Sequence, residues 1–233
     1  MIEKEIRVAR IFDFCLELIK WPMAILAVVA MPALLEAFDY FHMANMRFFA
    51  FLGGAFVYLA LKVVASARTN VSMQILAHEF THIFFALLTF HKVVHIHLNM
   101  DESGGAMGFK GKGNWLIVVS PYFFPLCLFF LIVIISLFSE KMPEGYWING
   151  ILGYFFAYHV ASMLVQIHGD QPDFKEAGFM FCLLFLPSAN IFSCSLVLAF
   201  NNGGFLFMQR YLEIIYKLIL KDLSFCFNYI TSL

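Results

Sequence analysis

Five stretches of the chain are long and apolar enough to cross a lipid bilayer, and they constrain the fold more than any other feature. These stretches are residues 21–38, 48–66, 115–138, 147–167 and about 177–200. A helix of about 20 apolar residues spans the roughly 30 Å of hydrocarbon in a bilayer. Because lipid cannot satisfy exposed backbone groups, a chain crosses it only as helices or as a closed barrel. Runs of this length are too long for membrane strands and therefore predict helices.

The composition agrees with a membrane protein. Hydrophobic residues make up 62% of the chain and charged residues 13%, whereas soluble domains are closer to one half and one quarter. The formal net charge of -1 gives no field that attracts nucleic acid. With a further span over residues 71–90, we expect an all-α polytopic membrane protein of about six transmembrane helices, surrounded by a lipid bilayer and without a nucleic-acid partner.

Two segments do not follow the pattern of membrane spans. Residues 91–114 alternate apolar and polar side chains in VVHIHLNM and then become rich in glycine and charge. This pattern predicts a short strand-rich, membrane-associated insertion. Residues of about 205–229 space basic side chains among apolar ones, which predicts an amphipathic helix at the membrane interface. No internal repeat divides the sequence, so we expect a single integral membrane domain over residues 1–233 with its core at 71–200.

Individual residues within the spans carry further expectations. Pro32 predicts a kink, and Gly53 and Gly54 predict a close contact between helices. The basic residues indicate the orientation, because six spans put ten Lys and Arg residues on the side of the N-terminus and five on the other. Cytoplasmic loops carry the excess of Lys and Arg, so we expect both termini in the cytoplasm.

The span predicted over residues 71–90 contains the sequence HEFTH, with His78, Glu79 and His82 surrounded by apolar residues. Residues four apart on a helix lie on one face with Cβ atoms about 5 to 6 Å apart, so the two histidines can bind one metal ion. Glu79 is turned about 100° away from His78, which suits a base acting on water better than a metal ligand. A charged group at the centre of a membrane costs about 2.5–3.5 kcal/mol, so a metal partner is expected for this cluster.

A zinc site needs a third protein ligand and an open fourth position. The segment HGDQPDF, residues 168–174, offers three candidates. We prefer Asp173, because a carboxylate at the irregular start of a helix can turn toward the metal without breaking a ladder of hydrogen bonds. Asp170, which also suits a helix cap, and His168 remain alternatives.

The order of these motifs resembles the site-2 protease family of intramembrane zinc metalloproteases, particularly its small bacterial members without a PDZ domain. The resemblance rests on LAHEFTHIFFALLTF, the strand-like KVVHIHL, the turn GGAMGF, the apolar WLIVVSPYFFPLCLFFL and the distant aspartate of QPDF. It covers about residues 71–200. It implies that His78, His82 and Asp173 bind one Zn2+ ion per chain and that Glu79 is the catalytic base.

The same resemblance implies a substrate and a location. Members of the family hydrolyse peptide bonds in or near the transmembrane segments of other membrane proteins. Their strand-rich insertion is thought to guide an extended substrate, so a transmembrane protein or peptide is expected to bind by strand addition at residues 93–99. The resemblance to small bacterial members implies the bacterial cytoplasmic membrane.

Two other classes of function compete with the protease. A membrane di-iron oxygenase of the desaturase type would use the histidine pair together with His91, His95 and His97, since several imidazoles suit iron. It would leave Glu79 without an evident role. A non-catalytic membrane scaffold that merely retains the motif is the other alternative.

Overall fold

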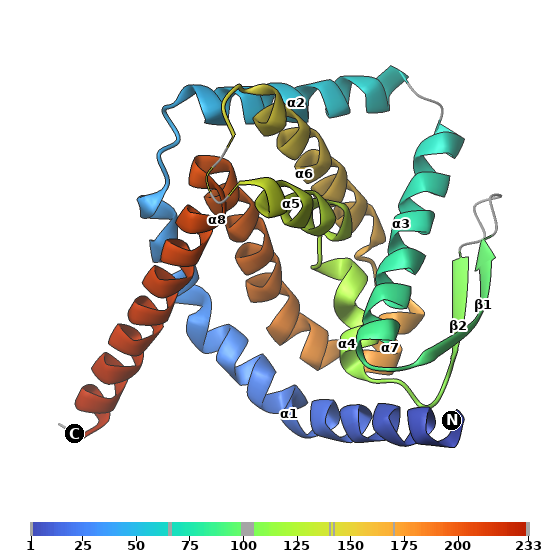
Figure 1. Cartoon of the computed structure of the whole chain (residues 1–233). Helices are drawn as coiled ribbons and strands as arrows, with labels where there is room; N and C mark the ends of the chain where they lie inside the picture. Colours follow the sequence, from blue (N-terminus) through green and yellow to red (C-terminus); the bar gives the residue numbers. More distant parts are fainter. Residues whose placement is uncertain are drawn as a thin grey trace.

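The protein is predominantly helical, as the computed structural model in Figure 1 shows. The structure describes residues 2–64, 67–98, 105–139, 141, 143–169 and 171–231. Its longer helices are α1 (Ile2–Glu36), α2 (Met46–Val64), α3 (Ala67–Leu88), α5 (Leu126–Phe138), α6 (Trp147–Gln166) and α8 (Phe179–Thr231). Its short elements are η1 (Ala37–Tyr40), α4 (Trp115–Val119), η2 (Ser120–Tyr122) and α7 (Pro172–Ala177), with strands β1 (Lys92–Leu98) and β2 (Gly105–Lys110).

Among the described residues, four helices are long and apolar enough to span a membrane, or five if one bent helix pair counts as a span. The four are Arg7–Tyr40, Met46–Val64, Trp147–Gln166 and Phe179–Phe225. The all-helical membrane character predicted from the sequence is therefore confirmed, but the count of six spans is not. Helix α3, which corresponds to the span predicted over 71–90, is not among the four candidates.

The apolar run predicted as one span over residues 115–138 is broken. Helix α4 and η2 end at Tyr122, α5 begins at Leu126, and the two parts are bent by 86°. Proline lies at both sides of the break: Pro121 stands in the first turn of η2, and Pro125 precedes α5. Because proline lacks a backbone donor and restricts the residue before it, these positions interrupt the helix. The span predicted over 115–138 is thus present as a bent helix pair, which is either one broken span or a re-entrant loop. The break brings Tyr122 toward α3 and α7.

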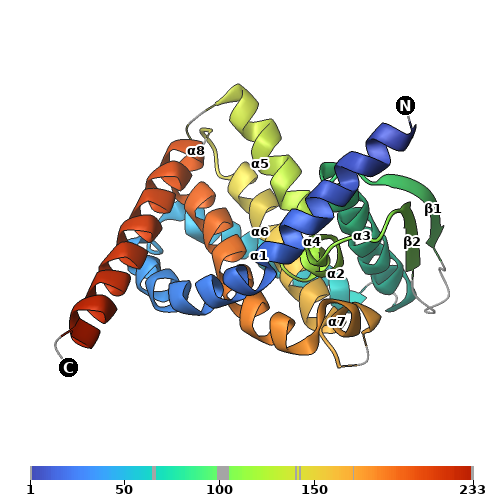
Figure 2. The same ribbon diagram turned by 90° about the horizontal axis from the view of Figure 1, so that it is seen from below.

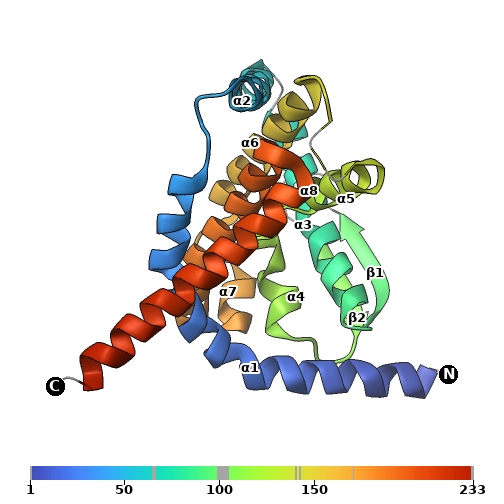
Figure 3. The ribbon, with the colours of Figure 1, turned by 60° about the vertical axis from the view of Figure 1, so that its left-hand side comes forward.

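The terminal helices α1 and α8 pack along each other and form much of the core. Helix α8 contains the non-helical residues Gly203 and Gly204, and Gly204 has a φ of 75°. At this point the chain turns back, so that α8 has two arms that diverge from one end of the molecule (Figures 1 and 3). The second arm buries Tyr211, Ile215 and Leu218 in the same cluster as α1. The two termini lie at opposite sides of the molecule (Figure 2).

Helices α2 and α6 pack closely through glycine. A Cβ atom at Gly54 would overlap the backbone of Gly150, and one at Gly153 would overlap the backbone of Phe51. The close contact predicted at Gly54 is therefore present, because only a residue without a side chain lets the two backbones approach this far. A Cβ atom at Gly53 would meet no atom of another described element within 4 Å, so the contact does not require glycine at this position. In Figure 1 helix α2 crosses the ends of α3 and α6.

The predicted insertion forms a two-stranded antiparallel hairpin beside α3 (Figures 1 and 2). The register pairs Lys92 with Lys110 and Leu98 with Gly105, and it shifts between Val93 and His95. The His95 ring occupies the space that a Cβ atom at Gly108 would need. The strand prediction is thus confirmed for residues 92–98, while residues 99–104 lie outside the described part of the chain.

Candidate metal centre

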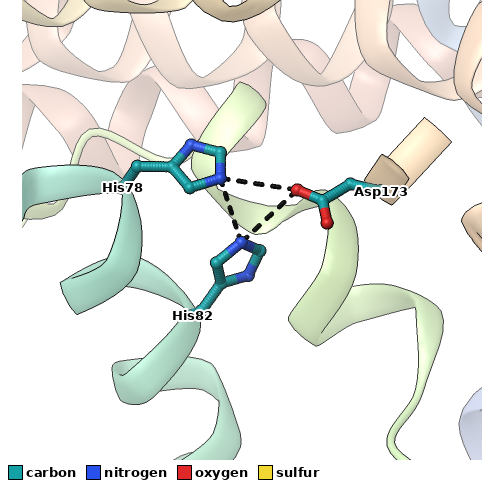
Figure 4. A group of neighbouring side chains, drawn as sticks. All are labelled: His78, His82 and Asp173. Carbon is teal, nitrogen blue, oxygen red and sulfur yellow. Dashed lines mark hydrogen bonds and ion pairs between the residues drawn. The ribbon is translucent and has the colours of Figure 1, made fainter. Parts of the chain in front are cut away.

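Helix α3 places His78 and His82 on one face, one turn apart, as their spacing predicts. Their side chains are largely buried, with 12% and 11% of their surface exposed. The two Nε2 atoms are 3.0 Å apart, and the rings meet edge to face. The helix thus holds two imidazole nitrogens at a single point (Figure 4).

Asp173 comes to the same point from the short helix α7. Pro172 stands in the first turn of this helix, and Gly178, with a φ of 92°, separates it from α8. Such a φ favours glycine, which lets the chain change direction directly after α7. The Asp173 Oδ2 atom lies 3.4 Å from the Nε2 atom of His78 and 3.4 Å from that of His82. The carboxylate is held by Tyr122, whose hydroxyl donates to Oδ2 at 2.8 Å.

The hydrogen bonds on the outer nitrogens determine which nitrogen of each ring faces the centre. His82 Nδ1 lies 2.8 Å from the backbone oxygen of Ile117, and His78 Nδ1 lies 2.6 Å from Oε1 of Gln166. Both oxygens only accept, so each Nδ1 carries the hydrogen and donates it. In neutral rings the two Nε2 atoms then present lone pairs toward each other and toward the Asp173 carboxylate. Three acceptors at this distance repel one another unless a cation lies between them.

This donor set fits zinc. Zinc binds histidine nitrogen and carboxylate oxygen at about 2.0–2.2 Å, and tetrahedral ligands at that distance are about 3.3 Å from each other. The measured separations are 3.0, 3.4 and 3.4 Å. Three protein ligands also leave a fourth position for water or substrate, as catalytic zinc sites do.

Glu79 is buried directly beside this group. Only 6% of its surface is exposed, and it lies within electrostatic reach of both histidines and of Asp173. It does not belong to the cluster of His78, His82 and Asp173 whose ligand atoms lie within 4.8 Å of one another. Glu79 therefore lies beside the three candidate ligands and outside their cluster, and its role as a base stays a prediction.

The other residues considered as ligands lie elsewhere or outside the described chain. His168 is exposed and its Nε2 atom lies 2.8 Å from Nε2 of Gln171. Asp170 lies outside the described residues. His91 is bound to Asp13 and Thr89, and the His95 ring packs against Gly108 of the hairpin. The additional histidines that a di-iron site requires do not gather at His78 in the described structure, and the side chain of His97 is outside it.

Two residues at this centre were not identified from the sequence: Tyr122 and Gln166. Tyr122 lies in SPYFFP, and its ring also contacts the His78 ring at 5.2 Å between centroids. Gln166 is the last residue of α6, 88 positions after His78. A tyrosine next to two prolines and a glutamine at the end of an apolar run are weak signals. The bend after η2 brings Tyr122 to the histidines, and side-chain hydrogen bonds from the end of α6 to α3 bring Gln166 there.

Comparison with known proteins identifies a family for this chain. The family model described as Peptidase M50B-like matches residues 49–169, which include the HEFTH motif, the hairpin and the bent helix pair. The match ends before Asp173, so the structure alone brings that residue to the histidines. No curated protein and no solved structure matches the chain. The matched segment covers more than half of the sequence, and the chain belongs to the Peptidase M50B-like family, part of the site-2 protease family of membrane proteases.

Proposed function

We propose that the protein is an intramembrane zinc metalloprotease, which hydrolyses peptide bonds in or near transmembrane segments of other membrane proteins. The observation that carries the proposal is the convergence of His78, His82 and Asp173, with Glu79 buried beside them. Two candidates from the sequence, the oxygenase and the scaffold, gain no support from this arrangement.

Each residue of the site has a separate role in the proposed peptide hydrolysis. Zinc, when bound, supplies a Lewis acid that polarises water and the scissile carbonyl group. Glu79 takes the proton from the attacking water and returns it to the leaving amine. His78 and His82 would hold the ion through Nε2, while the Nδ1–H group of each ring donates to Oε1 of Gln166 and to the backbone oxygen of Ile117, respectively. Tyr122 holds the Asp173 carboxylate by its hydrogen bond.

The substrate must be extended at the site of cleavage, because the carbonyl groups of a helix are engaged in its own hydrogen bonds. We propose that an unwound transmembrane segment adds as a strand to the hairpin at residues 93–99, of which residue 99 lies outside the described chain. In the described sheet, β1 pairs with β2 alone. A two-stranded sheet has unpaired edges, and main-chain bonding to such an edge binds a peptide with little selection of its side chains. The hairpin packs against α3, the helix that carries the histidines (Figure 1).

The proposed setting is the bacterial cytoplasmic membrane, with both termini in the cytoplasm. The six-span arrangement expected from the sequence puts ten Lys and Arg residues on the side of the N-terminus and five on the other, which favours this orientation. We treat the chain as one catalytic domain over residues 1–233, with the second arm of α8 at the membrane interface. That arm packs one face on α1 and exposes Leu212, Tyr216 and Leu220 on others.

The test is Glu79→Gln in the purified protein and in cells. We expect the variant to retain one zinc per chain and to lose at least 100-fold in cleavage, because general base catalysis typically contributes 10²–10⁴-fold. Glu213→Gln, an exposed position on α8, is the matched control. Metal analysis measures the zinc, and comparison of membrane proteomes identifies fragments cut within transmembrane segments. Full cleavage by Glu79→Gln contradicts the mechanism, two irons per chain favour the oxygenase, and absence of metal favours the scaffold.

A further inference from the structure

Gln166 forms the only side-chain hydrogen bond to the outer nitrogen of a histidine at the metal centre among the described residues. Its Oε1 atom lies 2.6 Å from Nδ1 of His78, and the pair is partly buried. The equivalent nitrogen of His82 donates to a backbone oxygen, that of Ile117. A substitution can therefore remove the partner of His78, whereas the partner of His82 persists through any change of side chain at position 117.

The amide of Gln166 is itself held in one orientation. Its Nε2 group donates to Oγ of Ser162 at 2.8 Å and lies 3.4 Å from the backbone oxygen of Gln74. The backbone oxygen of Gln74 only accepts, so it requires the NH₂ end of the amide, and the Ser162 hydroxyl can accept from the same group. The oxygen end of the amide therefore points at His78. Since that oxygen only accepts, the His78 hydrogen is placed on Nδ1 and the lone pair on Nε2, the atom that faces His82 and Asp173.

We propose that Gln166 is a positioning residue that fixes the ring orientation and tautomer of His78 for metal binding. The proposal rests on the proposed function, because it concerns the same metal centre. Partners that hold the outer nitrogen of a histidine ligand commonly change metal affinity 10- to 100-fold when they are removed. Gln166 reaches the three candidate ligand atoms through the His78 ring, which it contacts at Nδ1.

The position of Gln166 also links two ligands of the centre. It ends α6, and the chain then passes through a short connection to Asp173 in α7. The segment from 166 to 173 therefore orients the first ligand at one end and supplies the third at the other.

Zinc affinity of the purified full-length protein, measured by competition with a chelator, tests the proposal. We expect Gln166→Leu to bind zinc 10- to 100-fold more weakly. Gln166→Glu retains an acceptor oxygen for His78, so we expect its affinity to stay within about threefold of the wild type or to exceed it. Gln209→Leu, the same change at an exposed position of α8, is the matched control and should leave affinity unchanged.

A structural role for Gln166 alone would leave the metal environment intact, so a second readout is the visible spectrum of the cobalt-substituted protein. We expect a changed spectrum for Gln166→Leu and a spectrum close to the wild type for Gln166→Glu. Ser162→Ala, which frees the amide without touching His78, should weaken zinc binding by a smaller factor and remains informative if Gln166→Leu does not fold. Wild-type zinc affinity in folded Gln166→Leu, or equal losses in the Leu and Glu variants, overturns the positioning role. If the wild-type protein binds no zinc, the proposed function fails as well.

Discussion

The protein buries two groups that each combine histidine and aspartate, and they are built in opposite ways. In the candidate metal centre, His78, His82 and Asp173 direct three acceptor atoms at one point. In the second group, His91 Nε2 lies 3.2 Å from the carboxylate of Asp13, and Nδ1 lies 3.0 Å from Oγ1 of Thr89. Both nitrogens of His91 are thus bound within the protein, and no lone pair remains for an ion.

The second group connects parts of the chain that are distant in sequence. Asp13 belongs to α1, His91 precedes β1, and Asn114 caps α4 while its Nδ2 donates to Asp13 at 2.9 Å. Trp115 adds a bond from Nε1 to the backbone oxygen of Leu16 at 2.7 Å. This Asp13 cluster joins the N-terminal helix to the hairpin and to α4. The comparison shows that burial and residue type do not distinguish a candidate metal site from a structural hydrogen-bond cluster. The direction of the lone pairs on the histidine nitrogens does distinguish them.

Removal of a metal ligand should have the largest effect. We expect Asp173→Ala to lose zinc binding and cleavage, because two histidines alone do not form the three-ligand set of a catalytic zinc site. Chelator competition and cleavage of a membrane-embedded substrate measure the two losses, and the protein should remain folded. Asp39→Ala, at an exposed position, is the control. A variant that binds zinc normally would exclude Asp173 as the third ligand and direct attention to Asp170 or His168.

The corresponding change in the Asp13 cluster should affect stability and not metal. Asp13→Ala leaves His91 and Asn114 without their shared partner, and an unsatisfied buried polar group costs about 1–3 kcal/mol. We expect a lower Tm in detergent with zinc stoichiometry and affinity unchanged. Asp13→Asn, which keeps an acceptor for Asn114, should lose less stability. Loss of zinc at unchanged Tm would show that this group also belongs to the metal centre.

The sequence identified the metal centre better than the path of the chain around it. Spacing of four residues on a helix was sufficient to bring His78 and His82 together, because helix geometry alone fixes that distance. Asp173 was preferred over two neighbours because of its place at a helix start, and the structure does bring its carboxylate to the histidines. Its role as a ligand stays a prediction, as does the role of Glu79.

Features that depend on tertiary packing could not be derived from local patterns. The run 115–138 is apolar on both sides of Pro125, so it was predicted as one span, and local hydropathy does not reveal the bend of 86° between its two parts. The contacts of Tyr122 and Gln166 follow from that bend and from the packing of α6. The sequence also could not show that His78 faces the candidate metal centre while His91 has a structural role. The two histidines differ in their hydrogen-bond partners, and those partners are distant in sequence.

The smallest effect on zinc binding is expected from removal of the hydrogen bond between Tyr122 and Asp173. This bond corresponds to the bond from Asn114 to Asp13 in the Asp13 cluster. Tyr122→Phe removes the hydroxyl that donates to Oδ2 and keeps the ring that packs against His78 and Phe174. We expect zinc affinity to fall about 10-fold, the lower end of the range for partners of metal ligands. Tyr216→Phe, on an exposed residue of α8, makes the same chemical change away from the centre and should leave affinity unaltered. If Tyr122→Phe instead lowers Tm while zinc affinity is unchanged, the Tyr122 hydroxyl has a structural role like that of Asn114 in the Asp13 cluster. The direction of the lone pairs would then not be sufficient to distinguish the two groups.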